Sequence, residues 1–373
     1  MSRGNNSKLS VERFILMDKQ IVGGLLLTAF LFGQTTINPD FSVIGDLIID
    51  QSEDEIGLSS AGIEMVIQGY VNPFARADVY IHKHNDESAL ELEEAVITIE
   101  RGLPLGLGLR AGKFRPDIGK INKDHAHLFP FIQAPKSMAN ILGEEFWSPT
   151  GLEGSILLPL PWYTKLSIGY FDEGFGGHKH MLNDKSNEYD DYQGKDEEEG
   201  LSNGVLSGRW SHFIDLNDVT HLEVGASGYS GDEKSLLGAD LKFKWRPNKY
   251  RSLIIQGEVF QLNENRETRE NDLNSQYDEE NDKVKIIGYT FISYQFNKAW
   301  NMGLIEDFST FDISENEEDN HVDKSNYNFA LFFGYSPVEE SSVLRIRIAP
   351  DGDDINLMAQ FIWSLGPHKP HRY

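Results

Sequence analysis

Histidines spaced two residues apart are the side chains of this sequence best suited to bind a metal. The pairs are His82 and His84, His125 and His127, and His178 and His180. Residues i and i+2 of a strand point to the same side, so such a pair can offer two imidazoles to Zn²⁺. We take His125 and His127 as the candidate metal ligands, with Asp124 or Glu144 as a third. The alternative, which we favour, is that these histidines are polar residues of a pore lining or an aromatic girdle, and no cofactor is expected.

A long segment, 112–148, combines basic side chains with an apolar content too high for a solvated loop. Connections of this length usually have a function of their own. We predict that 114–147 is a loop folded into or over the interior of the protein, where its cations face carboxylates of the surrounding wall. The basic residues are Arg115, Lys120, Lys123 and Lys136, and the wall carboxylates are Glu64, Asp78, Glu94 and Asp240.

Most of the chain shows the pattern of β-strands that have two different faces. Near the end, for example, Leu344, Ile346 and Ile348 alternate with Arg345 and Arg347. This period of two is the mark of a strand between two environments. No segment past residue 36 shows an apolar stripe with the helical period of 3.6 residues. The elements that position the basic and acidic side chains are therefore predicted to be strands.

Sixteen candidate strands lie near 41–50, 61–71, 74–83, 90–101, 105–113, 151–159, 163–172, 203–213, 219–229, 235–246, 250–262, 284–296, 299–310, 326–336, 342–349 and 354–365. We predict an all-β fold, a closed antiparallel transmembrane β-barrel of about sixteen strands. Fourteen strands remain possible, because 41–50 is weak and 203–229 is ambiguous. Sixteen strands leave room for an aqueous lumen.

Alternation alone also fits a soluble sandwich or a lipocalin-like barrel. Three features favour the membrane. Tight turns rich in Pro, Asn and Asp alternate with connections that are often long and acidic, as in outer-membrane barrels. Aromatic residues gather near strand ends, as interfacial girdles require. Tyr373 ends the sequence shortly after strand 355–365, which resembles the signal read by barrel-insertion machinery. The longer connections are 51–57, 114–147, 174–201, 265–282 and 313–325.

The leading segment has the composition of a secretory signal peptide. An uncharged apolar run, 21–33, follows Lys19 and precedes small and polar residues. It is too short for a membrane-spanning helix, which needs about 20 apolar residues. We expect residues 1–35 to be cleaved, with initiation at Met17 as an option, and 36–373 to form a single barrel domain. The alternative is a buried core helix.

The formal net charge of −25 argues against nucleic acid as a partner. Most of the excess lies in short acidic stretches within 51–57, 184–199, 264–282 and 312–324, which we expect to be loops. The chain has no cysteine, so Cys-based metal sites and nucleophiles are excluded. The expected partners are outer-membrane lipid and lipopolysaccharide, small hydrophilic solutes and the barrel-insertion machinery, with a homotrimer as a possible assembly.

Several short motifs resemble a family of bacterial porin-like outer-membrane proteins, whose members are sometimes labelled zinc-regulated TonB-dependent receptors. The element 110–114 (RAGKF) is also similar to phosphate-selective porins. The motifs are Gly112-Lys113-Phe114-Arg115, Gly119, Asn122, His125-Ala126-His127, Pro130-Phe131, Leu142-Gly143-Glu144-Glu145 and the tail Leu365-Gly366-Pro367-His368, His371 and Tyr373. The resemblance implies fold and outer-membrane location, not the solute. An energised receptor needs about 22 strands and a separate plug, which this chain is too short to supply.

The predicted function is passive diffusion of small hydrophilic solutes or ions through a porin-like channel, without enzymatic activity. The expected pore-lining residues are Arg76, Asp78, Glu94, Arg110, Lys113, Arg115, Lys120, Lys123, Asp240, Lys242, Arg345 and Arg347. One alternative is a non-conducting surface binding or receptor barrel, with a metal-related role as an option. Another is a hydrolase at the barrel rim, with Asp124 and His125, or Asp215, Asp218 and His221, as its acid and base. No Gly-X-Ser-X-Gly element lies near a suitable histidine, which disfavours the hydrolase.

Overall fold

The structure is a computed structural model. It describes residues 38–52, 55–84, 90–143, 145–175, 204–231, 234–264, 283–313, 322–338, 341–352 and 354–366. The expected signal peptide lies outside these residues. So do the histidines of 178–180 and 368–371, the acidic stretch 184–199 and nearly all of 264–282.

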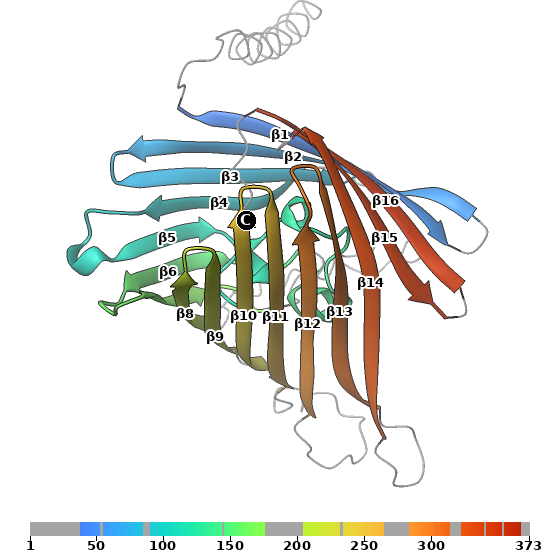
Figure 1. Ribbon diagram of the computed structural model, residues 1–373. Helices are drawn as coiled ribbons and strands as arrows, with labels where there is room; N and C mark the ends of the chain where they lie inside the picture. The colour runs from blue at the N-terminus through green and yellow to red at the C-terminus, as the bar shows by residue number, and fades with distance from the viewer. Residues whose placement is uncertain are drawn as a thin grey trace, which may run out of the picture. The chain divides into compact units, whose positions relative to one another are not determined.

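Sixteen antiparallel strands close into a barrel, as the alternation predicted (Figure 1). The strands are β1 (Asp40–Ser52), β2 (Glu55–Asn72), β3 (Ala75–His84), β4 (Glu91–Ile99), β5 (Gly108–Lys113), β6 (Thr150–Leu157), β7 (Tyr163–Phe171), β8 (Val205–Asn217), β9 (Thr220–Ser230), β10 (Lys234–Asn248), β11 (Arg251–Glu264), β12 (Lys283–Gln295), β13 (Trp300–Ile313), β14 (Val322–Val338), β15 (Ser342–Asp351) and β16 (Asp354–Leu365). Each strand pairs with its sequence neighbours, and β1 pairs with β16. The weak segment 41–50 is β1, which closes the ring.

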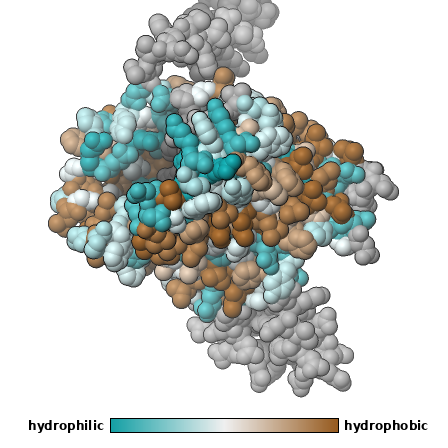
Figure 2. Space-filling model, viewed as in Figure 1, coloured by the Kyte–Doolittle hydropathy of each residue, from teal (hydrophilic) through white to brown (hydrophobic). Residues whose placement is uncertain are grey.

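The outward face of the strands is apolar and the inward face is mostly polar. In β15, Leu344 and Ile346 are 47% and 46% exposed, whereas Arg345 between them is 5% exposed. In β16, Phe361 is exposed and its neighbour Gln360 is buried. Figure 2 shows hydrophobic side chains spread over the outer surface of the strands. Apolar side chains in this number are exposed to the exterior only where that exterior is not water.

The tight turns use asparagine to satisfy the backbone. Asn72 Oδ1 accepts hydrogen bonds from the N–H groups of Phe74 and Ala75. Asn297 does the same for Ala299 and Trp300. A short amide side chain that accepts from the backbone two residues on replaces a ladder hydrogen bond at the end of a hairpin. This explains the turn signals recognised in the sequence.

One predicted connection between strands, the segment 51–57, is wrong. The acidic segment 51–57 was predicted to be a loop, but β1 continues to Ser52 and β2 begins at Glu55. Ile56 and Leu58 in this part of β2 are 73% and 56% exposed. A strand that extends past the apolar belt has water on both faces. Acidic side chains therefore do not prevent a strand from forming there.

The connection between β5 and β6 lies inside the ring of strands (Figure 1). It contains the short 3₁₀-helices η2 (Ile121–Lys123) and η3 (Ala126–Leu128) and the helix α2 (Lys136–Leu142). A further 3₁₀ turn, η1 (Pro104–Gly106), joins β4 to β5. In the described part of the chain, no helix has the length and apolar character to cross a membrane.

We expect a charge on the outward face to destabilise the barrel according to its depth. Ile346 lies in the middle of β15 opposite Ala359, and Ile346→Arg should lower the free energy of unfolding by about 2–4 kcal/mol. Ile355→Arg near the start of β16 is the control and should cost only about 0–1 kcal/mol. Urea unfolding in phospholipid vesicles measures both, and equal effects would contradict a lipid-facing surface.

Candidate functional site

An apolar core fixes the loop 114–149 within the lumen. Phe114 and Met138 are completely buried. The ring of Phe131 packs edge-on against Phe291 of β12 and Phe332 of β14, at centroid distances of 5.4 and 6.0 Å. Each such side chain contributes about 1.5–3 kcal/mol when it is fully buried. The apolar content of this segment, too high for a solvated loop, is therefore explained by the packing of its side chains against the wall.

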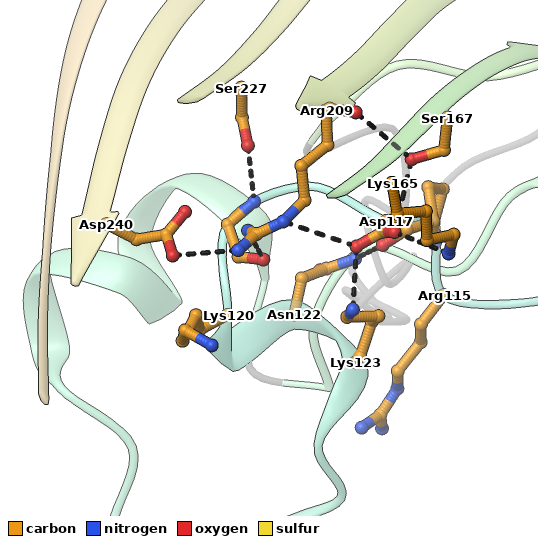
Figure 3. A network of polar contacts seen from close by, with 12 residues as sticks. Arg115, Asp117, Lys120, Asn122, Lys123, Lys165, Ser167, Arg209, Ser227 and Asp240 are labelled. Atoms are coloured by element: carbon orange, nitrogen blue, oxygen red, sulfur yellow. Dashed lines mark hydrogen bonds and ion pairs between the residues drawn. The ribbon is translucent and has the colours of Figure 1, made fainter. Parts of the chain in front are cut away.

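A buried carboxylate, Asp117, ties the start of the loop to β7 and β8 (Figure 3). Its oxygens lie 2.6 Å from Lys123 Nζ, 2.9 Å from Lys165 Nζ and 3.5 Å from Arg209 Nε. Arg209 also bonds Asp240 of β10 at 2.7 Å. Burial opposes the ionised form, but the three cations outweigh it and hold the pKa of Asp117 well below its usual range.

A glycine allows the loop to approach the opposite wall. Gly119 has a φ of +57°, and its N–H donates to Ser227 Oγ of β9 at 2.9 Å. A Cβ there would collide with the Glu258 carboxylate of β11. Glu258 in turn accepts hydrogen bonds from the Ile121 N–H at 2.6 Å and from the Tyr289 hydroxyl at 2.6 Å. Only glycine fits this close approach without strain.

The far end of the loop is anchored to β12, β13 and β15. Ser137 Oγ donates to the Gly288 carbonyl at 3.1 Å. The Lys136 N–H donates to Asp307 of β13 at 2.5 Å. Arg345 donates to the His127 carbonyl at 2.9 Å. The loop therefore crosses the lumen from β7 to β15. It folds into the barrel rather than over its mouth.

Acidic residues of β2 and β4 surround an imidazole from the loop. His125 Nδ1 lies 3.3 Å from Glu64 and 3.1 Å from Glu93, and His125 Nε2 lies 2.9 Å from Glu94. Burial and the positive charge of Arg115 oppose protonation of His125, but Glu64 and Glu93 outweigh them and raise the pKa of its imidazole well above the usual value.

A β-bulge in β4 places two successive carboxylates on the inside. Tyr80 of β3 is opposite Glu94, whereas the next residue, Ile81, is opposite Leu92. Glu93 is the extra residue, and both Glu93 and Glu94 are buried. A regular strand would turn one of them outward, so the bulge doubles the negative charge that faces His125.

A cavity of about 200 Å³ lies between the loop and the tight-turn end of β10–β13. Its lining includes Phe129 and Asp124 from the loop. The basic residues of its lining are Lys242, Arg246, Lys249, Lys298 and Arg345. Two of these basic residues, Lys249 and Lys298, are among those exposed to solvent. The cavity is thus predominantly cationic and borders water.

The predicted pore-lining residues mostly lie in the interior, but with different partners from those expected. Arg76 pairs with Asp78 on the same strand at 2.6 Å. Arg115 lies 3.5 Å from Glu93, Lys120 pairs with Glu223, and Lys123 pairs with Asp117 of the loop itself. Arg110 bonds Glu153 at 3.2 Å, and Arg347 bonds Asn356 at 3.0 Å. Lys242 and Arg345 line the cavity.

Lys113 differs from the other predicted residues. Its Nζ donates to the Leu92 carbonyl at 2.8 Å in an exposed contact, and Lys113 is opposite Ala95 rather than an inward residue. The predicted third metal ligands also differ. Asp124 lines the cavity, and Glu144 lies outside the described residues. Glu64 and Glu93 lie beside His125 instead.

Sequence reasoning missed the residues that hold the loop most firmly. Asp117, an acid in a basic loop, was not selected, nor were Arg209 and Glu258 on the wall. Arg209 and Glu258 both occupy inward positions of their strands, at 4% exposure each. A strict count of period two along β8 and β11 identifies both as inward residues, but not their partners.

Solved outer-membrane proteins share the barrel fold. The outer-membrane protein OmpT of Vibrio cholerae, in its trimer form, matches 88% of this chain and 99% of its own at a TM-score of 0.54 and 8% identity. OmpF of Salmonella typhi in complex with daunomycin has a TM-score of 0.55 at 9% identity, with 88% and 97% coverage. The outer-membrane channel DcaP of Acinetobacter baumannii has a TM-score of 0.51 at 12% identity, with 88% and 96% coverage. At these identities the likeness shows the fold alone.

The sequence comparisons add little about activity. No family model matches the chain. An uncharacterized protein of Aquifex aeolicus is 29% identical in a 209-residue alignment that covers 52% of this chain. The match spans 43% of that relative's length, less than half of it. The porin-like resemblance is thus supported at the level of the barrel, whereas nothing here assigns a phosphate-selective or zinc-regulated label.

Replacing the buried carboxylate should loosen the loop. Asp117→Asn removes the counter-charge of Lys123 and Lys165 and leaves Arg209 with Asp240, and we expect the free energy of unfolding to fall by about 3–5 kcal/mol. Asp218→Asn, in the exposed β8–β9 turn, is the control and should change it by no more than about 0.5 kcal/mol.

The same variant should change the pH dependence. Because the folded-state pKa of Asp117 is lowered, its contribution is complete above the unfolded carboxyl pKa of about 3.9 and is lost as the pH falls below it. Wild-type protein should therefore lose more stability in acid than Asp117→Asn. Urea titrations between neutral and acidic pH test this, and parallel curves would contradict the ionised role of Asp117.

Proposed function

We propose that this protein is a porin-like channel of the outer membrane that admits small hydrophilic solutes by passive diffusion. The observation that carries the proposal is a closed sixteen-strand ring with an apolar exterior, whose lumen is polar and is narrowed by a loop pinned inside it. A barrel of this strand number encloses an aqueous lumen. A loop held by buried ion pairs narrows that lumen, and a cavity remains beside it.

The charge of the cavity favours anionic solutes on the tight-turn side of the loop. Five cations line it, and Asp124 is the acidic residue of the lining. Rings of basic side chains favour anions in a pore because they offset the cost of removing water from the solute. The acidic stretch 184–199 and nearly all of 264–282 lie outside the described residues. We therefore propose that the pore prefers anions in the part of its path that this cavity forms.

The proposal includes location and assembly. Insertion into the outer membrane, contact with lipopolysaccharide and a homotrimeric assembly fit the fold, and the structure of OmpT with this fold is described as a trimer form. A hydrolytic role has less support. His221 Nδ1 lies 2.5 Å from Asp215, but the side chain of Asp215 is 66% exposed, so this pair lacks the dry surroundings that strengthen a catalytic dyad.

A second candidate is a barrel that binds a ligand without conducting. The apolar core that the loop forms with β12 and β14 favours it, because side chains fill that part of the lumen. Planar-bilayer recording of the purified protein separates the two functions. Silence at every voltage in correctly folded protein would favour the binding barrel over the channel.

A pair of adjacent residues allows a direct test of the pore path. The chain contains no cysteine, so Lys242→Cys introduces a single thiol at the cavity, and Leu241→Cys introduces one on the outward face. We expect an anionic methanethiosulfonate reagent to reduce the anion preference of Lys242→Cys, and a cationic reagent to restore it. Leu241→Cys is the control and should respond to neither, because thiolates react in water and not in lipid.

The readout is the reversal potential across a salt gradient, before and after each reagent. Opposite shifts with the two reagents place Lys242 on the ion path. Equal currents in both variants, with or without reagent, would rule out the cavity as part of the pathway.

A further inference from the structure

Three side chains from separate segments converge inside the barrel. Glu64 of β2, Glu93 of β4 and His125 of the loop each offer one ligand atom, and these atoms all lie within 4.8 Å of one another. All three residues are buried, with exposures of 8%, 8% and 5%. The two contacts of His125 Nδ1, at 3.3 and 3.1 Å, match the spacing of metal ligands. Two ligands at about 2.1 Å from a tetrahedral zinc are roughly 3.4 Å apart.

Polar atoms in this cluster lack hydrogen bonds. Within the described part of the chain, Glu64 Oε1, Glu93 Oε2 and His125 Nδ1 are buried and have no hydrogen-bond partner. Buried polar atoms without partners are costly in a folded protein, by about 1–3 kcal/mol each. A buried imidazole nitrogen that lies between two carboxylates, but makes no well-formed hydrogen bond to either, suits a site that is completed by a cation.

The imidazole of His125 is held in the orientation that such a site requires. Its Nε2 lies 2.9 Å from Glu94 Oε1, and the ring stacks on Tyr80 with 4.4 Å between the centroids. A metal-binding histidine commonly donates its other ring N–H to a carboxylate, which fixes the tautomer and directs the free lone pair to the metal. Glu94 takes that role here and leaves Nδ1 directed toward Glu64 and Glu93.

We propose that Glu64, Glu93 and His125 bind a divalent transition-metal ion, with zinc as the best match to one imidazole and two carboxylates. The ion ties the loop to β2 and β4, on the side of the lumen opposite the α2 anchor. His127, whose Nδ1 lies 3.4 Å from Glu64, is next to this set but outside the group of converging atoms. The site thus keeps one residue of the expected pair and adds two carboxylates from the wall.

Arg115, 3.5 Å from Glu93, competes with the metal for this carboxylate. Magnesium should not replace zinc, since it prefers a shell of oxygen atoms.

The test uses the full-length barrel, purified in detergent and stripped of metal. Dialysis against Zn²⁺ followed by metal analysis should find about one ion per chain attributable to the cluster. Glu93→Gln and His125→Gln should each weaken binding by at least tenfold. His221→Gln, near the start of β9 and away from the cluster, is the matched control and should bind as wild type does. Heat-dependent mobility in gels verifies that every variant is folded.

A second readout identifies the ligands. Co²⁺ in place of zinc should give a visible absorption spectrum of nitrogen and oxygen ligands that is lost in His125→Gln. Absence of zinc binding in folded wild-type protein overturns the site, and so does equal binding in both cluster variants. Conductance is scored separately: a channel that conducts but binds no zinc overturns the metal site alone, and a silent barrel that binds zinc overturns the channel alone.

Discussion

Backbone hydrogen bonding is the constraint on which the rest of this structure depends. Hydrocarbon offers no partners for N–H and C=O groups, so a sheet that crosses it must leave no open edge. The chain meets this requirement by pairing β1 with β16, from Val43 opposite Leu365 to Gln51 opposite Leu357. Inward side chains reinforce the seam, since Asn356 donates to Asp50 at 2.8 Å. Closure also separates an outer face from an inner one, which explains the alternation of side chains along every strand.

A closed ring of sixteen strands creates an interior that must itself be stabilised. The loop between β5 and β6 occupies it, and the inward faces of the strands are matched to the loop. β12 and β14 offer Phe291 and Phe332 to its apolar side. β4 and β8 offer Glu94 and Arg209 to its polar side. Because the two sides of the lumen differ in chemistry, the loop has one orientation in which both its apolar residues and its charges are satisfied.

This arrangement gives the lumen distinct electrostatic regions. Carboxylates of β2 and β4 gather around His125, whereas cations gather around the cavity near the tight turns. Asp117, beside β7 and β8, neutralises cations from both the loop and the wall. In the proposed channel, a solute beside the loop would meet the charges of Asp117 and His125, which buried ion pairs hold in place. Fixed charges of this kind orient solutes in a narrow pore.

The sequence by itself indicated the strands and their outward faces, and it left their number at sixteen or fourteen. Residues such as Leu344 and Ile346 alternate with Arg345 because each strand lies between two environments. This alternation of apolar and polar side chains repeats every two residues, so it can be recognised from neighbouring residues in the sequence. It also indicated that 114–147 is too apolar for a solvated loop. It did not determine that 51–57 is mostly strand, because an acidic stretch is compatible with a strand that extends into water.

Only the tertiary structure decided which charged side chains contact one another. Asp117 and Arg209, or Glu64 and His125, are far apart in the sequence, and their contact depends on strand order, register and the path of the loop together. The bulge that turns both Glu93 and Glu94 inward breaks the alternation from which the strand was recognised. Long-range contacts of this kind carry no local periodicity, and so the candidate metal site could be seen only once the barrel had closed around the loop.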